Sequence, residues 1–287
     1  MRKMKKVNCN EWNLIIEPKR ALFAIPIKEI KEYKDLIFLF VKRDFVIKYK
    51  QTVLGPAWYV ISPLIQAITY SFIFGRLAGL KTGGIPHLLF YYLGTILWDF
   101  FSTSFSDATN IFVNNVHLFG KVYFPRLVVP ISNVIGSLIK ISIQLLCLLS
   151  FYLYYAFTQG SPCPSIYLLC FPFILLWLAL LANGVGMIIS SITTKYKDLR
   201  LLMEFALSLA MYATAVVYPI SQIPEKYAWL SYVNPINAPL ELARIAFYGV
   251  GSLNTWILIS SISQTLIFFL LGLIFFNQNE RNFIDVL

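Results

Sequence analysis

The stretch ISIQLLCLLSFYLYYAFTQGSPCPSIYLLCFPFILLWLALLANGVGMIISSITT, residues 141–194, contains no charged side chain. A helix needs roughly 20 mostly apolar residues to cross the ~30 Å hydrocarbon core of a bilayer. The stretch is long enough for two crossings, and the cluster TQGSPCPS at residues 158–165 is typical of a turn between them. It therefore predicts two transmembrane helices, at about residues 127–157 and 166–191.

Other uncharged or nearly uncharged runs lie on both sides of this stretch. By the same length criterion they predict four further crossings, at about residues 57–75, 86–110, 201–218 and 254–276. Residues 57–276 then form one transmembrane domain, because the long apolar runs leave no room for a separate soluble domain. The sequence predicts an all-α integral membrane protein with six transmembrane helices.

The composition excludes an ordinary water-soluble fold. The chain of 287 residues is 58% hydrophobic and 13% charged, whereas an average soluble domain carries about 25% charged residues. The net charge of +10 does not indicate a nucleic-acid partner, because 13 of the 24 Lys and Arg residues lie between Met1 and Pro56. A cytoplasmic leaflet presents anionic lipids that attract such a basic segment.

Positive charges predict the orientation, because Lys and Arg are retained on the cytoplasmic side of a membrane. With the N-terminus inside, 19 Lys and Arg residues fall in inner segments and 4 in outer loops. We therefore expect a multi-pass protein of the cytoplasmic (inner) membrane. Its N-terminal segment, residues 1–56, and its C-terminal tail, residues 277–287, are expected to lie in the cytoplasm.

The sequence shows no pattern of a metal site. Its four cysteines have no CxxC spacing, so neither a disulfide scaffold nor a zinc site is indicated. His87 and His117 are the only histidines, and the predicted topology places them on opposite sides of the membrane. We expect no metal in this chain.

Residues Lys28 to Lys50 carry apolar side chains at helical spacing, but polar residues recur too often for a transmembrane segment. The pattern is typical of an amphipathic helix that lies in the membrane interface. An ordinary amphipathic helix with no partner is the alternative. We favour the interfacial helix, whose residues include Arg43, Asp44, Lys48 and Tyr49.

The segment Tyr218 to Gly251 is the longest predicted outer connection, and it is too apolar for a free loop. Four prolines divide it, and the part after Asn237 has the pattern of a short amphipathic helix that ends near Gly249. Short helices can dip back into the outer leaflet where protein buries their ends. We expect such re-entrant helices before the last span, with a loop lying on the surface as the alternative.

Six motifs are spread over nearly the whole chain. They are IIEPKR from Ile15, RDFVIKYKQTVLGPAWYVISPL from Arg43, IPHLLFYYLGTILWDFF from Ile85, GKVYFPRLVVPIS from Gly120, KYKDLR from Lys195 and IPEKYAWLSYVNPIN from Ile223. In this order they resemble the ABC-2 type permeases that export lipid-linked polysaccharides such as O-antigen, teichoic acid and capsule. The chain departs from the family's motifs at three places. Lys48 and Lys197 stand where the family usually has Arg, and only Arg244 is present from an FRW-like motif.

The resemblance implies a homodimer, surrounded by membrane lipids and joined by two copies of a separate ABC ATPase subunit. The chain has no GxxxxGK[ST] phosphate-binding loop, so we expect it to be no enzyme and to hold no cofactor. ATP and Mg²⁺ are expected on the partner. The implied substrate is a polysaccharide on a carrier of the undecaprenyl-pyrophosphate type; O-antigen is favoured, with teichoic acid or capsular polysaccharide as alternatives.

Energy then has to reach this chain through contact with the ATPase. The inner connection NNVHLFGKVYFPR, residues 114–126, is the candidate coupling helix, because its apolar side chains can enter a groove on the partner. A plain inner loop is the alternative. The candidate coupling residues are Asn114, Val116, His117, Leu118 and Phe119, with Lys195, Tyr196, Lys197 and Asp198 in the next inner connection.

The substrate path is less clearly marked in the sequence. Four aromatic residues recur on one face of the second span: Tyr91, Trp98, Phe101 and Phe105. Flat rings can stack on sugars, but we favour simple packing, because aromatic residues make up 16% of the chain. Tyr218 and Arg244 are further candidates for the path.

Asp99 and Lys140 are ionisable residues well inside predicted spans, which makes each a functional candidate. The rise of a helix places them at depths about 10 Å apart, so they can pair directly only if the two spans are offset. Lys140 is a candidate contact for a lipid pyrophosphate. A structural pairing, with Asp107 or Glu204 as further partners, is the alternative.

Other functional classes find less support in the sequence. An ion-coupled secondary transporter needs membrane-embedded acids or histidines, and scarcely any occur beyond Asp99. A membrane glycosyltransferase or acyltransferase needs carboxylates or a His base near one surface, and no such constellation occurs. A structural membrane subunit remains as a third alternative.

Overall fold

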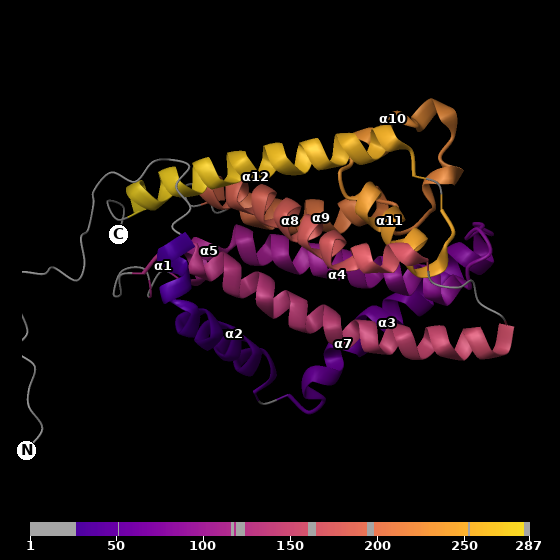
Figure 1. Cartoon of the computed structure of the whole chain (residues 1–287), viewed down its shortest axis with the longest axis horizontal. Helices are drawn as coiled ribbons and strands as arrows, with labels where there is room; N and C mark the ends of the chain where they lie inside the picture. Colours follow the sequence, from indigo (N-terminus) through magenta and orange to yellow (C-terminus); the bar gives the residue numbers. More distant parts are fainter. Residues whose placement is uncertain are drawn as a thin grey trace, which may run out of the picture.

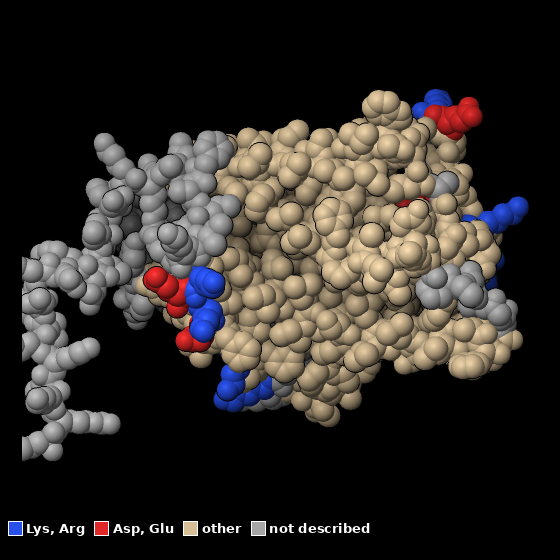
Figure 2. Space-filling model, in the orientation of Figure 1, with Lys and Arg blue, Asp and Glu red and all other residues tan. Residues whose placement is uncertain are grey.

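The computed structural model describes residues 27–50, 52–115, 118, 124–159, 165–193, 198–251 and 253–283, and every regular element in these ranges is a helix. The all-α prediction is confirmed for this part of the chain. On the face shown in Figure 2, charged side chains lie towards the two ends of the molecule, with an almost uncharged band between them.

Four helical segments are long and apolar enough to cross a membrane: Gly55–Leu77, Val128–Thr158, Ile166–Thr193 and Thr255–Gln278. They coincide with the first, third, fourth and sixth predicted spans. Their elements are η1 (Gly55–Ala57), α3 (Trp58–Tyr70), the π-helical turn η2 (Ser71–Leu77), α7 (Val128–Gln159), η3 (Ile166–Cys170), α8 (Phe171–Thr193) and α12 (Thr255–Phe283). Helix α7 ends at Gln159 and η3 begins at Ile166, so the break between the two spans lies where it was predicted, and residues 160–164 of the predicted turn lie outside the described residues. In contrast, α12 continues into the segment predicted as a tail.

The second predicted span is α4 (His87–Thr109), which lies in the middle of the bundle (Figure 1). It packs against α3, α7 and α8, and most of its side chains are buried. Asp99 and several hydroxyl groups make α4 less apolar than the four segments above. A central helix tolerates these groups because other helices, which can offer hydrogen bonds, surround it.

The prediction for the fifth span, residues 201–218, is wrong at its C-terminal end. Helix α9 (Asp198–Tyr212) stops six residues earlier, and turns follow it. The backbone N–H of Ala215 donates to Asn237 Oδ1 at 2.8 Å, and Asn234 Nδ2 donates to the carbonyl of Ala213 at 3.1 Å. Side chains from the next segment thus replace helical hydrogen bonds, and hydropathy does not reveal this exchange.

Helix α8 lies between α4 and α12, with a glycine at each contact. A Cβ atom on Gly184 would lie 2.7 Å from the Cα and N atoms of Phe269 in α12. A Cβ atom on Gly186 would lie 3.0 Å from the carbonyl oxygen of Phe105 in α4. These glycines let the helix backbones touch, which is a common way for helices to associate in membranes.

The segment predicted as one interfacial helix, Lys28 to Lys50, consists of α1 (Ile27–Glu32) and α2 (Lys34–Tyr49). Helix α2 packs against α7, and the ring of Phe40 meets that of Phe124 edge-on, with 5.7 Å between centroids. Its other side exposes apolar residues, among them Phe38 at 73%. The exposed apolar side agrees with a place in the membrane interface, which stays a prediction.

The predicted outer segment, residues 218–251, contains short helices. They are η4 (Ile220–Gln222), η5 (Glu225–Tyr227), α10 (Trp229–Val233) and α11 (Asn237–Tyr248). The prediction of a helix that ends near Gly249 is confirmed, because Gly249 caps α11 with a φ angle of 65° in the left-handed region. Ten of the twelve residues of α11 are buried, against α4, α8, α12 and η3, so this part is not a surface loop.

Candidate functional site

A cavity of about 360 Å³ lies between α2, α4 and α7. This volume is within the range of about 300–1,000 Å³ that is usual for small-ligand sites. The polar and charged residues in its wall are Arg43, Asp44, Tyr59, Thr103, Asp107, Asn114, Asn115, Ser132, Asn133, Ser137 and Lys140. The structure thus brings together residues that the sequence assigned to the interfacial helix, the coupling segment and the substrate path.

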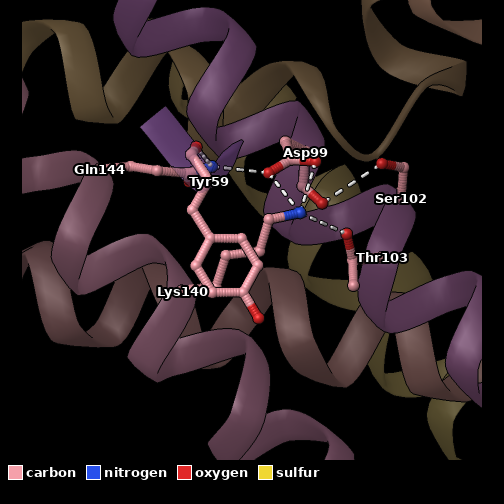
Figure 3. Close-up of polar contacts among 6 residues, drawn as sticks. All are labelled: Tyr59, Asp99, Ser102, Thr103, Lys140 and Gln144. Carbon is pink, nitrogen blue, oxygen red and sulfur yellow. Dashed lines mark hydrogen bonds and ion pairs between the residues drawn. The ribbon is translucent and has the colours of Figure 1, made fainter. Parts of the chain in front are cut away.

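Lys140 of α7 and Asp99 of α4 form an ion pair at this cavity (Figure 3). Lys140 Nζ lies 2.7 Å from Asp99 Oδ2 and also donates to Thr103 Oγ1 at 3.1 Å. The two charged side chains are 17% and 28% exposed. The spans are therefore offset, as direct pairing requires, and Glu204 pairs instead with Arg200 at 3.5 Å.

Gln144, one turn beyond Lys140, links the ion pair to the carbonyl of Tyr59 in α3 (Figure 3). Pro63 lies inside α3 and has no N–H, so the carbonyl of Tyr59 lacks its usual helical donor four residues later. Gln144 Nε2 donates to that carbonyl at 2.9 Å and to Asp99 Oδ2 at 2.8 Å. One buried amide therefore joins three helices: α3, α4 and α7.

A second polar cluster surrounds Arg244 of α11, whose side chain is 2% exposed. Its Nη1 donates to Glu241 Oε2 at 3.2 Å, and its Nη2 donates to the carbonyls of Ala215 and Val216. The guanidinium lies 3.7 Å from the centroid of the Phe90 ring, within the range of a cation–π contact. Arg244 thus supports the turns that follow α9.

The structure does not bring Arg244 and Lys140 together. Their contacts on α4, Phe90 and Asp99, are about 14 Å apart along the helix axis. Tyr218 is half-buried at the end of the turns that Arg244 supports. The substrate-path candidates therefore fall into two separate groups.

The four aromatic residues of the predicted stripe are buried within the chain. Tyr91, Trp98, Phe101 and Phe105 are 0–7% exposed. The rings of Trp98 and Phe101 have centroids 5.6 Å apart, and Phe101 stacks on Phe105 at 6.1 Å. This arrangement agrees with the packing role that we favour over contact with sugar.

Comparison with known proteins gives the family. A model of the ABC-2 type transporter family matches residues 35–248, most of the chain. The chain belongs to the ABC-2 type transporter family. It is therefore a membrane subunit of a transporter, and its family implies an ABC ATPase as partner.

Individual relatives of this permease are similar over most of their length. Two O-antigen export system permease proteins RfbA from Klebsiella pneumoniae are each 27% identical over 254 residues, which is 88% of this chain and 95% of the relative. A protein of the same name from Myxococcus xanthus is 25% identical over 224 residues, 77% of this chain and 84% of the relative.

The predicted coupling residues of the permease are only partly described. Asn114 ends α5 (Ile111–Asn114), and Leu118 is half-buried beside the cluster that includes Phe112. Asp198 is exposed at the start of α9. The others lie outside the described residues: Val116, His117, Phe119, Lys195, Tyr196 and Lys197.

The interfacial residues of the permease include one close ion pair. Arg43 Nε donates to Asp44 Oδ1 at 2.7 Å, and the Arg43 guanidinium lies 4.7 Å from the centroid of the Phe40 ring. Lys48 and Tyr49 belong to the last turn of α2, and their side chains lie outside the described part of the chain.

Sequence reasoning missed Gln144 and Glu241. Gln144 follows Lys140 by four residues and so shares its helix face, and it is a polar residue in an otherwise apolar run. Glu241 precedes Arg244 by three residues, which is also a spacing for side-chain pairing. Both spacings were available as signals.

We expect Gln144→Leu to lower the free energy of unfolding by about 1–3 kcal/mol, because two partly buried acceptors, the Tyr59 carbonyl and Asp99, lose a donor. The measurement is unfolding by dodecyl sulfate in mixed micelles. Pro63→Ala restores an N–H to α3, so the loss on Gln144→Leu should be smaller in that background. If Gln144→Leu lowers the free energy of unfolding equally in the wild type and in the Pro63→Ala variant, Gln144 and Pro63 are not linked.

Proposed function

We propose that this chain is the membrane-spanning subunit of an exporter that moves lipid-linked polysaccharide, of the O-antigen kind, across the cytoplasmic membrane. The observation that carries the proposal is the similarity to O-antigen export permeases along 88% of this chain and 95% of the relative. The alternatives are export of teichoic acid or capsular polysaccharide, which have the same lipid-linked chemistry.

The arrangement of helices supports six crossings. Besides the four long apolar segments, α4 runs through the middle of the bundle, and α9 lies beside α4 and α8. Helix α1 and the C-terminal end of α12 lie at the same end of the bundle (Figure 1). An even number of crossings has this result, and the excess of Lys and Arg in the N-terminal segment supports a cytoplasmic location for that end.

The same end of the bundle is the proposed contact for two ATPase subunits on a homodimer of this chain. Gly186 of α8 contacts the C-terminal half of α4 at Phe105 and Ala108. The connections that follow α4 and α8 therefore emerge at one end. These are the two predicted coupling segments, and the partner would bind the ATP and Mg²⁺.

Deleting the gene for this permease in its own cells tests the proposal. We expect lipid-linked glycan to accumulate at the inner face of the membrane, while the glycan at the cell surface is lost. Extraction of the glycolipid and antibody or lectin labelling of intact cells measure the two effects. Complementation with the wild-type gene is the control.

Purification of the tagged full chain from the complemented cells gives a second test. We expect an ABC ATPase to co-purify in mild detergent and its ATP hydrolysis to increase when lipid-linked glycan is added. Normal surface glycan in the deleted strain, or no associated ATPase, would overturn the proposal.

A further inference from the structure

The cavity between α2, α4 and α7 contains hydrogen-bonding groups that have no partner among the described residues. Ser137 of α7 lines it and is 4% exposed, and its Oγ has no hydrogen-bond partner in the described part of the chain. Asn133, one turn before Ser137, lines the same wall and makes no side-chain hydrogen bond to the described residues. A buried hydroxyl without a partner carries a cost of about 1–3 kcal/mol that a ligand can remove.

Aromatic rings form another part of the wall. Phe45 of α2 and Tyr59 of α3 line the cavity, with ring centroids 6.4 Å apart at an angle of 54°. Tyr59 therefore belongs both to the cavity and to the network of Lys140 and Asp99 (Figure 3). Apolar ring faces beside amide and hydroxyl groups match a ligand that has both C–H faces and hydroxyls.

The charges around the cavity are already matched. Arg43 pairs with Asp44 at 2.7 Å, and Lys140 pairs with Asp99 at 2.7 Å. Asp107, a second carboxylate in the wall, also has an interaction partner. The groups that remain available to bind a ligand are therefore neutral hydrogen-bond donors and acceptors, which favours an uncharged polar ligand over an anion.

We propose that this cavity is a carbohydrate subsite that holds one sugar residue of the exported glycan. Ser137 and Asn133 bind sugar hydroxyls, and the rings of Phe45 and Tyr59 cover an apolar face of the sugar. The volume of about 360 Å³ limits the site to a short piece of the polymer. This inference rests on the proposed function and adds to it a recognition site for the glycan.

Binding of two kinds of probe to the purified permease–ATPase complex in lipid nanodiscs tests the subsite. One is a short isoprenyl pyrophosphate without sugar, and the other is the same lipid carrying one glucose or one N-acetylglucosamine. We expect at least one sugar to increase the affinity about tenfold. The variant with Ser137→Ala and Asn133→Ala should reduce that gain to about threefold or less, because two hydrogen bonds of roughly 0.5–1.5 kcal/mol are lost.

Ser142→Ala is the matched control, because Ser142 lies on α7, is exposed, and does not line the cavity. This variant should show the same increase in affinity from the sugar as the wild type. The inference is overturned if neither sugar adds affinity, if the double variant keeps the full gain, or if a density map of the complex shows a phospholipid headgroup filling the cavity. In each case the deletion test still decides separately whether the permease exports glycan.

Discussion

Arg244→Met is expected to lower the free energy of unfolding of the permease by about 3–5 kcal/mol. Glu241, which is 2% exposed, would then be a buried charge without its partner. The carbonyls of Ala215 and Val216 would lose the donor that supports the turns after α9. Unfolding by dodecyl sulfate in mixed micelles measures the loss, and glycan export in complemented cells should fall with it.

Two variants separate the buried pair from a general effect of charge. Arg76→Met removes an exposed cation from η2 and should change stability by no more than about 0.5 kcal/mol. The double variant with Glu241→Met and Arg244→Met should recover part of the loss, because no unpaired charge remains. If the free energy of unfolding of the Arg244→Met variant lies within about 1 kcal/mol of the wild-type value, Arg244 does not stabilise the turns after α9.

Gly184→Ile is expected to prevent close packing of α8 on α12. Its Cβ atom would lie 2.7 Å from the Cα and N atoms of Phe269, and a backbone cannot rotate away as a side chain can. Overpacking of this kind costs about 3 kcal/mol or more, the upper end for small-to-large core changes. Fluorescence-detected gel filtration should show the monodisperse peak of the permease largely lost.

Gly136→Ala is the matched control for this variant. Gly136 lies in the apolar helix α7, and a Cβ atom there would meet nothing within 4 Å. Its elution profile should equal that of the wild type. Because Ala has a higher helix propensity than Gly, the free energy of unfolding should rise by no more than about 1 kcal/mol. If Gly184→Ile elutes as the wild type does, the contact between α8 and α12 is not as close as described.

The sequence predicts the long apolar helices well, because their length and lack of charge are sufficient signals. The break between α7 and η3 and the end of α11 at Gly249 were also predictable from Pro, Gly and Ser chemistry. The end of α9 was not. It depends on Asn234 and Asn237, which follow in the sequence and supply the hydrogen bonds that a helix would otherwise make.

The candidate site was predictable only as separate residues. Lys140 and Asp99 attract attention because they are charged within spans, but their pairing depends on the offset between α4 and α7. The hydropathy pattern does not indicate that offset. Ser137 and Asn133 give only the weak signal of polar residues in a mostly apolar run, and their proposed role depends on the cavity that α2 forms when it packs on α7.

The glycines of α8 also limit how the permease can change shape. Gly184 holds the backbone of α8 against α12, and Gly186 holds it against α4, so these three helices form a rigid block. Sliding them past one another would push a backbone into a neighbouring backbone. Helices α3 and α9, whose outer sides are exposed, remain free of such glycine contacts within the described residues. We therefore expect any change of shape during a transport cycle to leave the packing of α4, α8 and α12 intact.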